Sequence, residues 1–251
     1  MVTAASTNPD ITTRGYKMIF RTIGLDSLQG PTAGNFIADK IKPKNLAIIH
    51  DKQQYGEGIA SAVKKTTEGK GINVVMYEGI TAGDKDFSSL IAKMKKANVD
   101  FVYYGGYHPE LGLILRQSAE QGLGAKFMGP EGVGNKDIST IAGQAAEGLY
   151  VTLPPSFDQL PENQGLVDAF KAKGEDPSGA FVMTSYSAVQ VMADAMKKTG
   201  GTDTKAIQEA MHSMTFNTPT GSIEFDEKGD LKSFGFVIYN WHADGSKTEI
   251  K

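Results

Sequence analysis

Three polar side chains stand close to where the sequence predicts that apolar strands end. Tyr107 follows the apolar run at 100–104, Glu131 follows the run at 126–129, and Tyr55 comes shortly after the run at 45–50. In an open α/β sheet, ligands bind beyond the carboxyl ends of parallel strands, so we expect these side chains on one rim. There a carboxylate can hold a cation, and phenols can donate hydrogen bonds and wall a pocket. Two plainer interpretations stay open at this point, a solvated loop carboxylate for Glu131 and ordinary ring packing for the tyrosines.

Other motifs do not point to catalysis. His50-Asp51 resembles a metal-hydrolase dipeptide, but the other histidines are isolated, so no set of three metal ligands is visible. The stretch 56–61 imitates the dinucleotide-binding G-x-G-x-x-G, yet it ends in serine and begins several residues after the strand. The stretch 226–230 lacks the ligand spacing of a calcium loop and indicates a surface hairpin. Since no nucleophile–base pair is visible, we predict a protein that holds a small zwitterion, with no catalytic residue, metal or cofactor.

The composition argues against several classes of protein. The chain has 251 residues with 26 Lys and Arg against 29 Asp and Glu, and this near-neutral balance argues against a nucleic-acid partner. The absence of cysteine excludes disulfides, thiolate catalysis, iron–sulfur clusters and cysteine-type zinc sites. No apolar run approaches the ~20 residues of a membrane span. We therefore expect a globular protein of one or two domains.

Apolar runs and amphipathic segments alternate along much of the chain. Short, almost continuous apolar runs predict buried strands at 45–50, 73–77, 100–104, 126–129 and 148–152. Helical spacing of apolar residues predicts helices at 29–41, 56–65, 86–96, 109–120 and 136–142. Such alternation implies parallel pairing with right-handed crossovers, so residues 45–152 are predicted to form one doubly wound α/β lobe.

The pattern changes after residue 153. Helices are predicted at 165–173, 178–198 and 204–211, extended segments at 218–225 and 235–241, and one strand near the start at 16–21. The stretch 226–230 separates the two extended segments in the manner of a hairpin turn. Because long helices with so few strands need another sheet to cover, we expect a second lobe, with Pro154-Pro155 as a crossing point.

The first residues carry neither the basic region nor the apolar core of a secretory signal. Met1-Val2, followed by small residues, resembles the end of a buried strand that opens into a loop, and Asn8-Pro9 is a turn signal. We therefore expect that a segment upstream of this loop is absent. A flexible N-terminal tail is the alternative interpretation.

Several stretches resemble one family over the whole length of the chain. They are 7–9, 20–22, Asp26-Ser27-x-Gln29-Gly30-Pro31-Thr32-Ala33, 50–58, 100–107, 127–134 and Trp241-His242-Ala243-Asp244-Gly245. They are similar to the leucine/isoleucine/valine-binding proteins, the periplasmic solute receptors of branched-chain amino-acid ABC importers. The resemblance implies an α/β fold of the type I periplasmic-binding-protein class, with two doubly wound lobes joined by three crossovers.

The resemblance also implies how the chain is divided. Residues 1–24 and 154–234 would be the remnant of the first lobe, and residues 25–153 and 235–251 would form the second. The family's first βα units, roughly a hundred residues at ~30 per βαβ unit, have no counterpart, so the first lobe is expected to be incomplete. We expect the chain as written to bind amino acids poorly or not at all. It would stay in the cytoplasm without a signal, whereas the intact family member works in the periplasm.

A ligand site follows from the same resemblance. In the family, the ligand's α-ammonium meets a loop carbonyl, a threonine hydroxyl and a glutamate, which correspond to Ala5, Thr7 and Glu131. The α-carboxylate meets the backbone of the threonine loop, a serine loop further upstream and a tyrosine that corresponds to Tyr107. A carboxylate across from the ammonium makes physical sense, because a charge taken out of water must be paired and hydrogen-bonded.

The resemblance assigns Tyr55 and Phe181 to the walls of the side-chain pocket. The expected partners are a small L-amino acid, such as leucine, isoleucine or valine, and the permease subunits of an ABC transporter, with the receptor itself a monomer. Two alternatives remain. An amino-acid-sensing domain of the same fold would need a membrane span or a fused output domain, and a flavodoxin-like or Rossmann enzyme would need a phosphate loop or a catalytic pair.

Overall fold

The computed structural model describes residues 1–251, and the chain divides into two compact units. Unit 1 consists of residues 1–25 and 154–235, and unit 2 consists of residues 26–153 and 236–251. Each unit is therefore assembled from segments that are far apart in the sequence.

Unit 2 is built on a seven-stranded sheet with the order β11-β10-β7-β6-β5-β3-β4. Neighbouring strands from β4 to β7 pair in parallel, and β10 lies antiparallel to β7 with β11 beside it. Strands β3, β5, β6 and β7 are almost entirely buried, which explains their apolar runs in the sequence, whereas Val75 and Tyr77 of the edge strand β4 are each 37% exposed. The strand bounds are β3 (Leu46–His50), β4 (Val74–Gly79), β5 (Phe101–Gly105), β6 (Lys126–Gly129), β7 (Leu149–Leu153), β10 (Val237–Trp241) and β11 (Lys247–Glu249).

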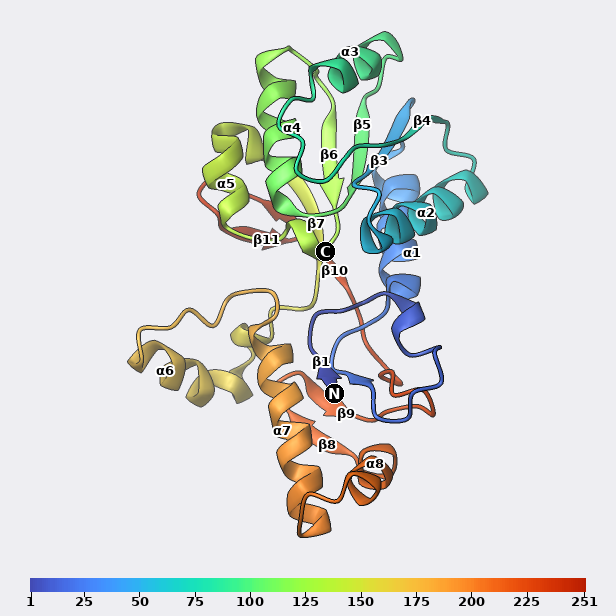
Figure 1. Ribbon diagram of the computed structural model, residues 1–251. Helices are drawn as coiled ribbons and strands as arrows, with labels where there is room; N and C mark the ends of the chain where they lie inside the picture. Colours follow the sequence, from blue (N-terminus) through green and yellow to red (C-terminus); the bar gives the residue numbers. More distant parts are fainter. The chain divides into compact units, whose positions relative to one another are not determined.

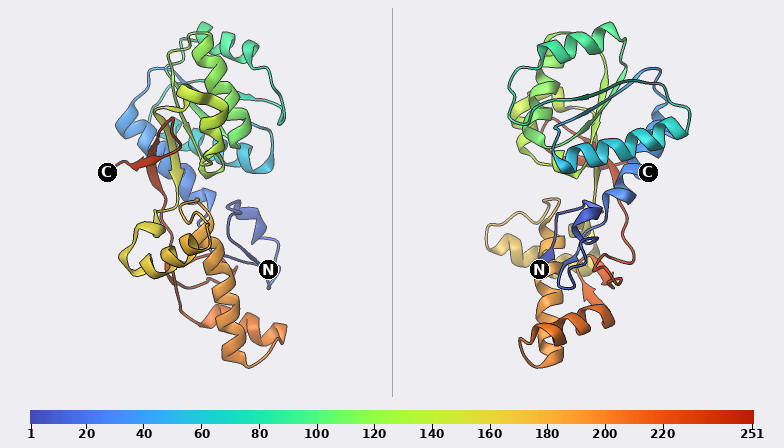
Figure 2. Two further views of the ribbon diagram at one scale, coloured as in Figure 1. Left: turned by 90° about the vertical axis from the view of Figure 1, so that its left-hand side faces the viewer. Right: turned by 45° about the vertical axis from the view of Figure 1, so that its right-hand side comes forward.

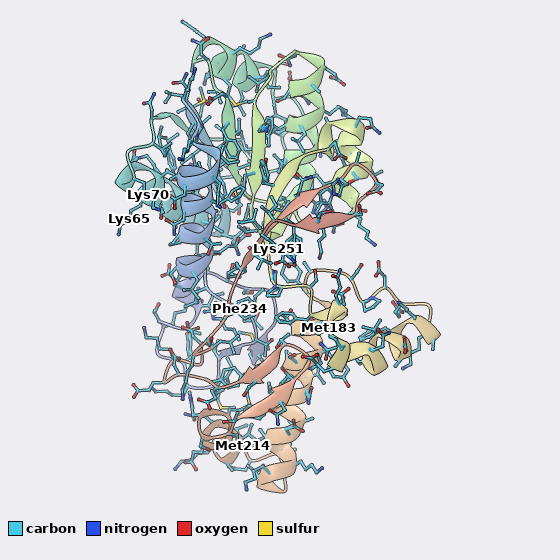
Figure 3. All side chains as sticks on the ribbon, turned by 180° about the vertical axis from the view of Figure 1, so that it is seen from behind. Lys65, Lys70, Met183, Met214, Phe234 and Lys251 are labelled. Atoms are coloured by element: carbon cyan, nitrogen blue, oxygen red, sulfur yellow. The ribbon has the colours of Figure 1, made fainter.

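Helices cover both faces of this sheet (Figure 1). Helix α1 (Asp26–Phe36), which continues as a π-helical turn (Ile37–Ile41), packs against α2 (Gln54–Gly69) on one face. The other face carries α3 (Ser88–Lys96), α4 (His108–Glu120) and α5 (Asp137–Ala142). Helix α2 is amphipathic: Val63 is in the core, whereas Lys65 is exposed, as is Lys70, the residue that follows the helix (Figure 3).

Two glycines let α1 approach α2 closely. A Cβ added at Gly30 would lie 2.5 Å from the Cβ of Ala62, and one added at Gly34 would lie 2.6 Å from the Cβ of Thr66. These distances are far below van der Waals contact, so only a hydrogen on the α-carbon fits at either position. The packing of α1 places its first turn, which includes Gln29, next to β7.

Unit 1 is smaller and has little sheet of its own. Strand β1 (Val2–Thr3) pairs in parallel with β2 (Phe20–Arg21), and β8 (Phe216–Thr218) pairs antiparallel with β9 (Gly221–Ile223). The β8–β9 hairpin packs along α7 (Val182–Thr199), which also contacts α8 (Thr204–Ser213) (Figure 2). Helix α6 (Gln164–Ala172) meets α7 through the rings of Phe170 and Tyr186, whose centroids are 6.3 Å apart. The core of the unit joins Phe20, Val191, Ile207, Phe216 and Phe225.

Local signals explain where the helices of unit 1 begin and end. The Asp203 side chain caps α8 by accepting a hydrogen bond of 2.8 Å from the backbone N–H of Ala206. Helix α7 ends at Thr199, and the next residue, Gly200, caps it with a φ of 72° in the left-handed region.

Short 3₁₀ turns occur in both units, at Pro9–Ile11, Glu131–Val133, Gly143–Ala146, Phe157–Gln159 and Pro161–Asn163.

Some expectations about the elements are wrong. The segment 16–21 is extended only at its last two residues, and the strand β11 was not expected. The hairpin turn expected at 226–230 is present, closed by an antiparallel bridge between Phe225 and Leu231. The segments 218–225 and 235–241 do not otherwise pair, because β9 turns back on β8 and β10 joins the sheet of unit 2. A left-handed glycine, Gly221 with a φ of 98°, makes the tight β8–β9 turn. No helix of the chain is both long enough and apolar enough to cross a bilayer.

Candidate functional site

The structure brings Tyr55, Tyr107 and Glu131 together at the carboxyl edge of the parallel strands in unit 2. Tyr55 lies in the first turn of α2, Tyr107 immediately precedes α4, and Glu131 opens the 3₁₀ turn after β6. The hydroxyl oxygen of Tyr55 accepts a hydrogen bond of 3.2 Å from the N–H of Gly132. The rings of Tyr55 and Tyr107 pack with 5.2 Å between their centroids and 40° between their planes. The rim predicted from the strand ends is thus present.

Glycine at position 132 allows these elements to meet. A Cβ there would lie 2.7 Å from the carbonyl oxygen of Gly106 and 3.0 Å from the ring of Tyr55. Any larger residue would push the loop that carries Glu131 away from Tyr55 and Tyr107.

Glu131 is buried, with 3% of its surface exposed, so the interpretation of it as a solvated loop carboxylate is wrong. Its backbone N–H donates to Oε1 of Gln29 at 3.4 Å, and the hydroxyl of Thr152 donates to the same oxygen at 3.0 Å. Gln29 and Thr152 are themselves fully buried. The loop after β6 is therefore connected to α1 and β7 through one buried amide.

The electrostatics of the rim suit a cation. Burial, together with the nearby carboxylate of Asp26, raises the pKa of Glu131 from 4.5 to about 7. Hydrogen bonds from the side chains of Gln29 and Tyr55 oppose this rise in pKa. Burial also raises the pKa of Tyr55 well above its usual value, so its hydroxyl stays protonated. A positive charge placed here would stabilise the ionised form of Glu131.

His50 and Asp51 do not form a metal site. The ring of His50 is buried against Tyr77, and its Nδ1 accepts a hydrogen bond of 3.2 Å from the N–H of Lys52. Asp51 accepts from the N–H of Gln53 at 2.9 Å and so shapes the turn before α2. No group of three or more His, Cys, Asp or Glu side chains in the chain could hold a metal ion.

The remaining predicted residues belong to unit 1. Ala5 and Thr7 lie on one loop after β1, where Ala5 is exposed and Thr7 is 1% exposed. Phe181 lies on a different element, at the position that precedes α7, and is half-buried. Its carbonyl oxygen accepts hydrogen bonds from the N–H of Ser185 and the hydroxyl of Thr184, which fix the first turn of α7.

Sequence reasoning did not single out Asp26, Gln29 and Arg21. Asp26 and Gln29 are three residues apart, hence on one face of α1, and both are buried. Two polar residues on the inner side of a helix could have been noticed, but the predicted helix began only at residue 29. Arg21 lies in a buried strand, where a charged residue calls for a partner.

The chain matches known proteins over its whole length. A family model described as "Periplasmic binding protein" matches residues 1–246. The chain is 60% identical over its full length to the leucine-, isoleucine-, valine-, threonine- and alanine-binding protein of Pseudomonas aeruginosa, of which it covers 67%. It is 53% identical to the Leu/Ile/Val-binding protein of Escherichia coli K12, of which it covers 68%.

The chain belongs to the periplasmic binding protein family. A crystal structure of the leucine binding protein LivK from Thermotoga maritima matches all of it with a TM-score of 0.91 at 29% identity, and the chain covers 72% of that structure. The family and the type I fold inferred from the sequence are thereby confirmed. This periplasmic binding protein spans about two thirds of the length of its curated relatives, whose names describe binding and not catalysis.

Proposed function

We propose that this protein is an amino-acid-binding receptor of an ABC importer, with leucine, isoleucine, valine or a similar small L-amino acid as its ligand, and that it is not an enzyme. The observation that carries the proposal is the buried carboxylate of Glu131 beside two tyrosines at the carboxyl edge of the sheet. The ligand names of its relatives at 60% and 53% identity support the choice of amino acid.

The proposed roles follow the chemistry of an amino-acid zwitterion. Glu131 pairs with the α-ammonium, and the carbonyl of Ala5 and the hydroxyl of Thr7 complete its hydrogen bonds. The hydroxyl of Tyr107 and the backbone around Thr7 bind the α-carboxylate. Each charge of the ligand leaves water on binding, so each needs an opposite charge or several donors to replace its hydration.

Tyr55 and Phe181 wall the pocket for the apolar side chain in this proposal. Selectivity among leucine, isoleucine, valine and alanine then depends on pocket volume, which is worth about 1–3 kcal/mol per methylene group. The proposed partners are the permease subunits of the importer, with a monomeric receptor and, for the intact family member, a periplasmic location.

Isothermal titration of the purified chain with a panel of L-amino acids tests the proposal. Because the chain as written is expected to bind poorly, we expect only weak heat, at millimolar leucine, isoleucine or valine; it should be lost in Glu131→Gln and retained in Glu120→Gln, a matched control at an exposed position. A folded wild-type protein that gives no heat with any amino acid at millimolar concentration would contradict the proposed function.

A further inference from the structure

Arg21 is a charged side chain that is fully buried in unit 1 and has no assigned role in ligand binding. Its exposed fraction is 0%, and its Nε donates to Oδ1 of Asp230 at 2.5 Å. A buried guanidinium is expensive to keep unless its remaining N–H groups are also hydrogen-bonded. The remaining N–H groups of Arg21 all have hydrogen-bond partners, and most of these partners are in the loop that contains Thr7.

The two terminal nitrogens of Arg21 donate hydrogen bonds to the residues on either side of Thr7. Nη1 donates to the carbonyl oxygen of Ser6 at 2.7 Å and to that of Asn8 at 3.2 Å. Nη2 donates to the carbonyl oxygen of Asn8 at 3.2 Å and to the hydroxyl of Thr12 at 2.9 Å. The residue on either side of Thr7 is thus tied to the same planar group.

The turn at 226–230 holds Arg21 in place. The carboxylate of Asp226 accepts from the N–H of Asp230 at 2.9 Å, and the carbonyl oxygen of Gly229 accepts from the N–H of Arg21 at 3.0 Å. Gly229 has a φ of 91°, and a Cβ there would overlap the carbonyl oxygen of Ile19, so the turn requires glycine. The hydroxyl of Thr12 donates to the carboxylate of Asp230 at 2.9 Å and closes the network.

We propose that Arg21, held by Asp230, is a positioning residue that fixes the loop 5–8 for ligand binding. The proposal rests on the proposed function, because it assigns the loop's fixed shape to the binding of the amino acid by Ala5 and Thr7. It also gives the stretch 226–230 a role, since that turn presents Asp230 to the arginine instead of binding calcium.

The geometry requires arginine and not merely a positive charge. A guanidinium presents five donors in one plane, so it can pair with a carboxylate and reach two carbonyls and a hydroxyl at once. The ammonium of lysine is a point charge and can pair with Asp230 without spanning Ser6 and Asn8. Arg21→Lys therefore removes the link to the loop while it keeps the charge.

The test compares Arg21→Lys and Thr12→Val with Val191→Ala, a control in the core of unit 1 that leaves the network intact. Amide hydrogen exchange, followed by mass spectrometry on the full chain without ligand, reports on the peptide that covers residues 4–9. We expect exchange in this peptide to rise at least about tenfold in Arg21→Lys, less in Thr12→Val, and not in Val191→Ala at matched stability. Leucine affinity should fall in the same order.

The outcomes separate this inference from the proposed function. Loop exchange that follows overall stability equally in all three variants would overturn the positioning role, even if the wild type binds leucine. A wild type that binds none of the amino acids in the panel would overturn the proposed function and the ligand-binding part of the inference, whereas faster exchange confined to the loop would still support the positioning role of Arg21. If Arg21→Lys does not fold, Thr12→Val gives the same comparison.

Discussion

The pKa of Glu131 predicts that leucine binding depends on pH in the neutral range. The ligand's ammonium needs the ionised carboxylate, but burial and Asp26 raise the pKa of Glu131 to about 7. At pH 6 only about a tenth of the carboxyl groups are then ionised, and at pH 8 about nine tenths are. The ammonium of leucine stays protonated over this range, so the dissociation constant should fall about tenfold from pH 6 to pH 8.

Calorimetry can measure this effect in two ways. The dissociation constant is compared at pH 6 and pH 8, and the heat at pH 6 is measured in buffers of different ionisation enthalpy. Binding at pH 6 should release close to one proton, about 0.9 per site, because the bound carboxyl group loses its proton. The ratio between the two pH values does not depend on the absolute affinity, so the test works even for a weak complex.

Glu131→Gln is the control for this experiment. The amide cannot ionise, so its affinity should be independent of pH and at least about 30-fold weaker at pH 8, the usual loss when one partner of a buried charge pair is removed. A wild-type dissociation constant that is constant from pH 6 to pH 8, with no proton release, would refute the pairing of Glu131 with the ammonium.

Three further predictions concern stability. Folding raises the pKa of Glu131 from 4.5 to about 7, so the free energy of unfolding of the wild type falls as pH rises through that interval. The free energy of unfolding of Glu131→Gln, measured in urea at pH 8, should therefore be about 3 kcal/mol larger than that of the wild type. This difference should vanish below about pH 4, and a difference that is the same at both pH values would contradict the raised pKa. Gly30→Ala should destabilise by about 1–3 kcal/mol despite alanine's better helix propensity, because its Cβ meets Ala62 at 2.5 Å, and a gain in melting temperature would disprove the close packing. Asp203→Ala should cost about 1 kcal/mol in the same urea assay through loss of the α8 cap, with Asp203→Asn near wild type.

The fold of unit 2 could be predicted from local patterns. Its central strands β3, β5, β6 and β7 are buried between helices on both faces, so each appears in the sequence as a short apolar run beside an amphipathic helix. Glu131 and Tyr107 could be found because both directly follow such runs. The pairing of β10 with β7 could not, because neither strand's residues say which partner it takes.

The supporting contacts of the site escaped prediction for a different reason. Gln29 reaches Glu131 and Thr152, and Arg21 reaches Asp230, across long separations in the sequence. The sequence separation of each pair does not predict the contact, because only the tertiary fold brings the two residues together. A polar residue in an apolar element indicates that a partner exists, and it does not identify that partner.

Unit 2 is formed from two separate segments of the chain, 26–153 and 236–251, and this has a consequence for protein synthesis. On the ribosome, β7 emerges before residues 154–235 of unit 1, and β10 emerges only after them. Until then β7 exposes the backbone N–H and C=O groups that β10 will bind, which is the kind of open edge that pairs with other chains. A nascent chain that stalls within residues 154–235 would carry the five parallel strands with the β7 edge still unpaired. Chaperones that cover exposed strands would matter most during this interval of synthesis.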